Sequence, residues 1–152
     1  TSIGVAYVPF NAEEGRYAED EKEFLKEFFS LIEQAVLERV QTMQSLAASR
    51  DAAQHVNEFQ AVERQIHLLQ PPRELGAVHA LVLDGIGEQR LFIEEWRGAV
   101  REGRSIDVAS HPLVRSSSAK LHKAYARLME LYPSEGKNKE AMYSHLCALD
   151  FV

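Results

Sequence analysis

Polar side chains on the apolar side of a helix are the residues in this sequence with the clearest potential for chemistry. A projection at about 100° per residue puts Arg39 and Glu63 within or at the edge of such apolar stripes. His79, Gln89 and Tyr132 occupy similar positions on later helices. A guanidinium beside a carboxylate and an imidazole is suited to holding a small anionic or polar ligand, with Arg39 as the anion-binding group.

Estimated heights along the helices place Arg39, Glu63 and His79 in one layer of the expected fold, with Tyr132 nearby. The favoured interpretation is structural: Arg39 pairs with Glu63, and His79 is their hydrogen-bonded neighbour, because a buried charge without a partner is costly. The alternative is that the same residues, together with Gln89, line a pocket for a ligand.

A two-metal centre held by carboxylates needs Glu side chains from two helices and Glu-x-x-His pairs from two others. The nearest patterns are His55 with Glu58 and Glu63 with His67. Glu58 and His67 are expected to point away from the helix interface, so four ligands do not converge. The sequence therefore predicts no metal site.

Nucleophilic catalysis has little support in the sequence. Ser110 precedes His111 and three serines occupy 116–118, but neither a nucleophile-elbow motif nor an orienting acid accompanies them. The sequence has no phosphate-binding loop, no GxGxxG and no HExxH. We therefore expect no catalytic residue and no cofactor, and a non-enzymatic protein is the simpler explanation.

These residues must be positioned by helices, because apolar residues recur in steps of three and four along most of the chain. The pattern predicts one domain over 1–152, with an extended arm, four long helices and a short fifth helix at 1–14, 15–48, 51–70, 72–103, 111–132 and 137–149. Short connections make consecutive helices antiparallel. The expected fold is therefore all-α, an up-down four-helix bundle followed by the short helix.

Local signals support these helix boundaries. Asp51 and Ser110 are the expected N-caps, whose side chains accept hydrogen bonds from the free amides of a first turn. Pro72 suits a first turn, where its missing amide is no loss, and Gly103 is expected to end the third helix. Gly85 lies toward the apolar face, which indicates close approach of a neighbouring helix.

The composition is that of an ordinary globular protein, with 45% apolar and 26% charged residues. The formal net charge of -6 argues against a nucleic-acid partner, which requires a basic surface. No apolar run approaches the roughly 18 residues needed to span a bilayer. The single cysteine, Cys147, excludes an internal disulfide and is expected to be a small buried hydrophobe.

A cytoplasmic location is the default expectation. The chain begins at Thr1 and not at methionine, so the alternative is a periplasmic or surface-tethered location after removal of a leader.

The leading functional hypothesis is association between proteins, most simply as a homodimer. The first long helix exceeds the second in length, so its surplus apolar surface needs cover from the fifth helix, the arm or a second copy of the chain. The candidate interface residues are Tyr7, Phe10, Phe24 and Phe29. The pattern resembles small bacterial helical-bundle proteins in general, a likeness that transfers no functional residue. The alternative is a protein or enzyme that binds a small ligand through the Arg39 layer.

Overall fold

The computed structural model describes residues 8–133 and 136–151, so the candidate interface residue Tyr7 lies outside the described residues. Over this part of the chain there are five α-helices and no strands, and the all-helical prediction is confirmed there. The helices are α1 (Glu19–Ala47), α2 (Ala53–Leu68), α3 (Gly76–Glu102), α4 (Pro112–Leu131) and α5 (Lys137–Leu149). Two short 3-10 turns precede α1 and α3, namely η1 (Ala12–Glu14) and η2 (Arg73–Leu75).

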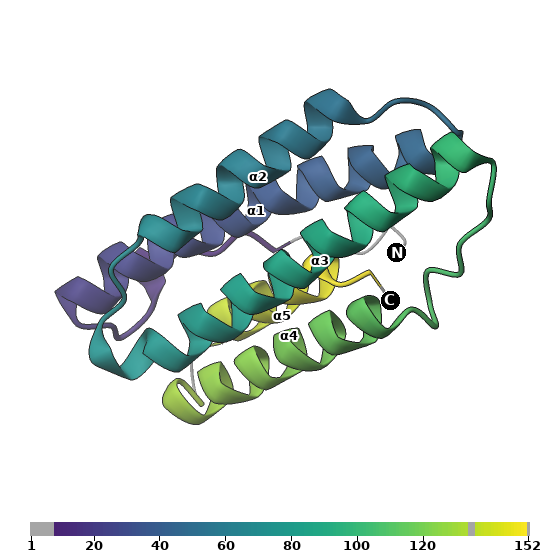
Figure 1. Ribbon diagram of the computed structural model, residues 1–152. Coiled ribbons are helices and arrows are strands. Elements are labelled where there is room, and N and C mark those ends of the chain that lie inside the picture. The colour runs from purple at the N-terminus through teal and green to yellow at the C-terminus, as the bar shows by residue number, and fades with distance from the viewer. Residues whose placement is uncertain (1–7, 134–135, 152) are drawn as a thin grey trace.

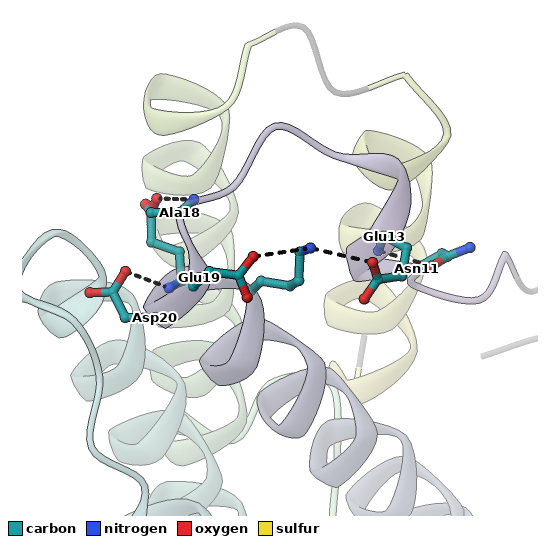
Figure 2. Close-up of polar contacts among 7 residues, drawn as sticks. Asn11, Glu13, Ala18, Glu19 and Asp20 are labelled. Atoms are coloured by element: carbon teal, nitrogen blue, oxygen red, sulfur yellow. Dashed lines mark hydrogen bonds and ion pairs between the residues drawn. The ribbon is translucent and has the colours of Figure 1, made fainter.

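The segment before α1 differs from the expected extended arm, because part of it forms η1. Asn11 caps this turn: its side-chain oxygen accepts a hydrogen bond from the backbone N–H of Glu13 at 3.0 Å (Figure 2). The carboxylate of Glu21 accepts from the backbone N–H of Ala18 at 3.0 Å, which satisfies an amide at the start of α1. As a result, α1 begins later than the predicted position 15.

Side chains also accept hydrogen bonds at the starts of α2 and α4, although neither predicted N-cap occupies the cap position. Ala52 occupies it at α2, next to the predicted Asp51. Asp51 accepts a hydrogen bond from the first-turn amide of Ala53 at 3.1 Å. Ser110 is not the cap of α4, because His111 takes that place and its Nδ1 accepts from the backbone N–H of Leu113 at 3.1 Å. The prediction for Ser110 was therefore wrong by one residue.

Gly103 ends α3 in the left-handed conformation, at φ 69°, as the sequence predicts. Pro72 precedes η2 and does not open α3, so the third long helix starts later than expected. The expected close approach at Gly85 is present, because Ser117 Oγ on α4 donates to the carbonyl of Gly85 at 3.0 Å. This contact belongs to the tight packing of α3 on α4.

Consecutive helices run in opposite directions along a common axis, so that α1, α3 and α5 point one way and α2 and α4 the other (Figure 1). The most extensive packing is that of α3 on α4, followed by that of α1 on α2. Helix α5 packs against both α1 and α4, and α2 packs against α3 to a similar extent. Helix α5 is therefore a member of the central packing.

The chain itself covers the apolar surplus of α1. Phe24 and Phe29 are only 6% and 1% exposed. Phe10 is half-buried and stacks on Phe29 with ring centroids 4.8 Å apart, and His145 of α5 meets the ring of Phe29 edge-on at 5.3 Å. The cover comes from the N-terminal segment and from α5, two of the alternatives that the sequence left open. Phe24 and Phe29 are consequently not on the surface of the folded chain.

Candidate functional site

Buried polar side chains from α1 and α3 meet the C-terminal end of α5. Arg39 of α1 is 1% exposed, and its Nη2 donates to the carbonyl of Ala148 at 2.6 Å. Gln89 of α3 is fully buried, and its Nε2 donates to the next carbonyl, that of Leu149, at 2.7 Å. The last carbonyls of a helix have no partner within the helix, and burying them unpaired is costly. Arg39 and Gln89 therefore supply the hydrogen bonds that allow this helix end to be buried.

The residues just after α5 are held in the same place. Asp150 is buried, and its Oδ2 accepts from Ser118 Oγ of α4 at 2.7 Å. The guanidinium carbon of Arg39 lies 5.4 Å from the ring centroid of Phe151, which is a cation–π contact. We term Arg39, Gln89 and Ser118 the C-terminal cradle, because all three contact the end of α5 or the residues directly beyond it.

Arg39 is a buried cation, and its surroundings act on its charge in two directions. Burial lowers the pKa of its guanidinium to about 10, and the charge of Asp150 opposes that shift. The side chain therefore stays protonated at neutral pH, where it faces the negative end of the α5 dipole. Its Nη1 donates to Sδ of Met43 at 2.9 Å. The buried Nε of Arg39 and Oε1 of Gln89 have no hydrogen-bond partner among the described residues.

Glu63 does not belong to the C-terminal cradle, and its partner is not the predicted Arg39. Its Oε1 accepts from Nε of Arg90 on α3 at 2.8 Å, so the predicted pairing with Arg39 was wrong. The sequence pattern did not indicate Arg90 as a partner. This residue follows the buried Gln89 and lies about 100° further round the helix, outside the apolar stripe. The ion pair stands in an open groove of about 390 Å³, the α2–α3 groove, lined by Gln60, Glu63, Arg64, His67, Leu83 and Arg90.

His79 has a structural role at the end of α2. Its Nε2 donates to the carbonyl of Ile66 at 2.7 Å, and its ring meets that of Phe24 edge-on at 5.8 Å. This bond adds a side-chain donor to a carbonyl in the last turn of α2 that also accepts from the backbone N–H of Leu69. The predicted layer of Arg39, Glu63 and His79 was wrong, because each of the three binds a different partner in a different place.

Tyr132 joins the end of α4 to the start of α1. It is 6% exposed, its hydroxyl donates to the carboxylate of Glu21, and its ring meets Tyr17 edge-on at 5.0 Å. Of the five predicted ligand-binding residues, the structure thus brings together only Arg39 and Gln89, through two successive carbonyls of α5.

His111 is a residue whose role the sequence reasoning missed. Because Nδ1 accepts from a backbone amide, the ring proton is on Nε2, which donates to Oε2 of Glu95 at 2.6 Å. Both ring nitrogens are engaged, so neither is free for acid–base chemistry. Pro112 was a usable signal, since proline at the first helical position marks the preceding residue as the cap.

A serine, an aspartate and a histidine come together at the cradle, but in the wrong order for nucleophilic catalysis. Ser118 donates directly to Asp150, and Nε2 of His122 lies 3.8 Å from the same carboxylate oxygen. A catalytic relay needs the histidine between the serine and the acid. Within residues 8–133 and 136–151, no group of three or more His, Cys, Asp or Glu side chains is arranged to hold a metal ion.

Cys147 is exposed on α5, so the prediction of a buried cysteine was wrong. Among the helices of the described part of the chain, none is both long enough and apolar enough to cross a membrane. Comparison of the chain with protein-family models, curated proteins and solved structures gives no match. The cradle and the α2–α3 groove are therefore the basis for a functional proposal.

Replacing Arg39 with alanine is expected to destabilise the fold by about 3–5 kcal/mol, because it leaves the carbonyl of Ala148 and the carboxylate of Asp150 without their cation. Gln89→Leu is expected to cost about 1–3 kcal/mol, the cost of one unpaired buried carbonyl. Arg64→Ala, at an exposed position, is the control and should hardly change the midpoint of urea unfolding. Equal midpoints for the Arg39 and Arg64 variants would contradict this role of the cradle.

His145 should make the stability of the fold depend on pH. Burial lowers its pKa in the folded state, although its Nδ1 donates to the carbonyl of Ala141 at 2.7 Å. The unfolded chain, with a His pKa of about 6.5, then binds the proton more tightly. The contribution of His145 to the free energy of unfolding is therefore present above about pH 6.5. It is lost as the pH falls through the lowered pKa that His145 has in the folded state.

We therefore expect His145→Gln to reduce the loss of unfolding free energy between about pH 7 and pH 5, measured by urea unfolding. The wild-type protein at each pH is the reference. Parallel curves for the two proteins across that range would show that this histidine does not titrate differently on folding.

Proposed function

We propose that the protein binds a small anionic ligand in the α2–α3 groove. The observation that carries this proposal is the lining of the groove, which sets two arginines, a histidine and a glutamine against one glutamate. Donor-bearing side chains in this excess favour a guest that is negatively charged and rich in acceptor oxygens. Of the ligand-binding residues predicted from the sequence, only Glu63 lines this groove, so the proposal keeps the ligand class and moves the site to Arg64 and Arg90.

Arg90 is oriented for such a contact. Glu63 engages its Nε, which holds the plane of the guanidinium at the groove. Its terminal nitrogens have no partner among the described residues and are open to a ligand. The Arg90 side chain is 35% exposed, so it is partly withdrawn from water, and an ion contact there is stronger than at a fully exposed site.

The other side of the groove belongs to α2. Arg64 and His67 are exposed and lie one turn apart on the same face of the helix. A ligand with two acidic groups can therefore contact Arg64 and Arg90 at once, one from each helix. At Gly87 a Cβ atom would come within 3.6 Å of Oε2 of Glu63, so the glycine keeps space open beside the ion pair.

The size of the groove suits a small molecule. Sites for small ligands measure about 300–1,000 Å³, and this groove is near the lower limit at about 390 Å³. Leu83 adds an apolar contact to the polar lining. A compact ligand with carboxylate or phosphate groups fits these features.

Homodimeric association and a four-helix framework of α1 to α4 stay predictions from the sequence. In the described residues, the large apolar side chains that remain exposed are single ones on four different helices: Leu37, Leu68, Leu91 and Tyr143. Scattered apolar side chains are normal on a protein surface. Anion binding is favoured over association because the groove gathers its residues in one place.

The test is an NMR titration of isotope-labelled protein with citrate and, separately, with inorganic phosphate at constant ionic strength. We expect amide shifts confined to the groove-facing parts of α2 and α3, and a Kd for Arg90→Gln that is weaker by at least about tenfold. Arg127→Gln is the matched control, a partly exposed arginine on α4 that is likewise paired with a glutamate, and it should bind as the wild type does. Unchanged affinity in Arg90→Gln, or shifts at arginines all over the surface, would overturn the proposal.

A further inference from the structure

The C-terminal cradle has the features of a binding site, although its occupant belongs to the same chain. Arg39 and Gln89 donate to two successive carbonyls, a contact that any helix end can accept. Ser118 adds a bond to the carboxylate of Asp150. Arg39 also contacts the ring of Phe151. The cradle therefore recognises a helix that ends in an acidic residue followed by an aromatic one.

The ring of Phe151 at the aromatic position is buried and has two specific contacts. Phe151 is 5% exposed, and its ring meets that of Phe92 on α3 edge-on at 5.4 Å. The ring thus contacts both the guanidinium of Arg39 and an aromatic side chain of another helix. Such contacts favour an aromatic ring over an aliphatic side chain at this place.

Helix α5 is the helix best able to leave the rest of the structure. It has 13 residues, and isolated helices of that length are marginal in water. It follows the other four in the chain. Its release breaks contacts with α1, α4, the N-terminal segment and, at its C-terminal end, Gln89 and Phe92 of α3, but it leaves the packing of α1 on α2 and of α3 on α4 in place. Elements with fewer contacts open at lower free energy than the whole fold.

We propose that α5 is an intramolecular ligand that opens from the cradle as a unit, and that the same segment of a second copy binds in its place. The second copy is the partner because its segment has the sequence that the cradle already accommodates. An exchange restores every contact of the closed chain. Recognition follows the helix-in-groove mode, with Met142, Leu146 and Leu149 buried and the polar contacts at the helix end.

This inference does not depend on the α2–α3 groove, and its test uses different residues. Amide hydrogen exchange of the unmodified protein tests the opening. We expect the amides of α5 to exchange together, at least about tenfold faster than the slowest amides of α3 and α4. If α5 exchanges at the rate of those amides, it opens only when the whole chain unfolds, and the proposal is overturned.

Binding in trans tests the partner. A fluorescein-labelled peptide of residues 137–152 is added to the full chain carrying Met142→Ala, which weakens docking of the chain's own α5 and leaves the cradle intact. By fluorescence anisotropy we expect binding at least about tenfold tighter than that of the same peptide with Asp150→Asn and Phe151→Ala. Binding to the unmodified chain should be weaker, because its own α5 competes.

Equal binding of the two peptides overturns the proposal, since the acidic–aromatic end would then not be recognised. So does absence of binding to a Met142→Ala chain that keeps its helical circular dichroism signal. Ala141→Gly serves as a second variant in case the first fails to fold, because it lowers the helix propensity of α5 and removes less buried volume.

Discussion

The structure depends on how the end of a helix is buried. The last carbonyls of a helix lack partners within it, so a helix can end inside a protein only where other elements supply donors. Here α1 and α3 donate to two carbonyls of α5 through Arg39 and Gln89, and α4 binds the residue that follows. These bonds link four helices to one point, and they fix the position of α5 along its own axis. At the end of α2, His79 adds a second donor to a carbonyl that already accepts from the backbone.

Charge separates the two regions of interest. The guanidinium of Arg39 is enclosed and is balanced by carbonyl groups, a carboxylate and an aromatic ring. In the α2–α3 groove Arg64 is exposed and Arg90 is partly exposed, and the two arginines outnumber the single carboxylate. An enclosed cation whose surroundings compensate it favours a structural partner, whereas an open excess of donors favours a soluble anion. The two regions are therefore suited to different partners.

Helical periodicity was enough to predict the all-helical class, the five helices and the inward direction of Arg39 and Gln89, because these follow from local spacing. It did not predict which inward groups meet, since heights estimated from loop lengths can be wrong by a whole turn. Helix α5 was expected beside the bundle, so its carbonyls were not considered as partners for Arg39. At the start of α4 the general preference for serine as an N-cap favoured Ser110. Pro112 occupies the first helical position, however, and this makes the preceding His111 the N-cap.

The bond between Arg39 and Ala148 joins residues that are 109 positions apart in the sequence. Helix pairs that are neighbours in sequence can form early on the ribosome, but this contact must wait until α5 has been synthesised. Until then the nascent chain holds a cation and an amide in an interior that lacks their acceptors. Docking of α5 therefore completes the hydrogen bonds of Arg39 and Gln89 only after the other four helices have been made, and partly folded chains of this kind are prone to aggregate.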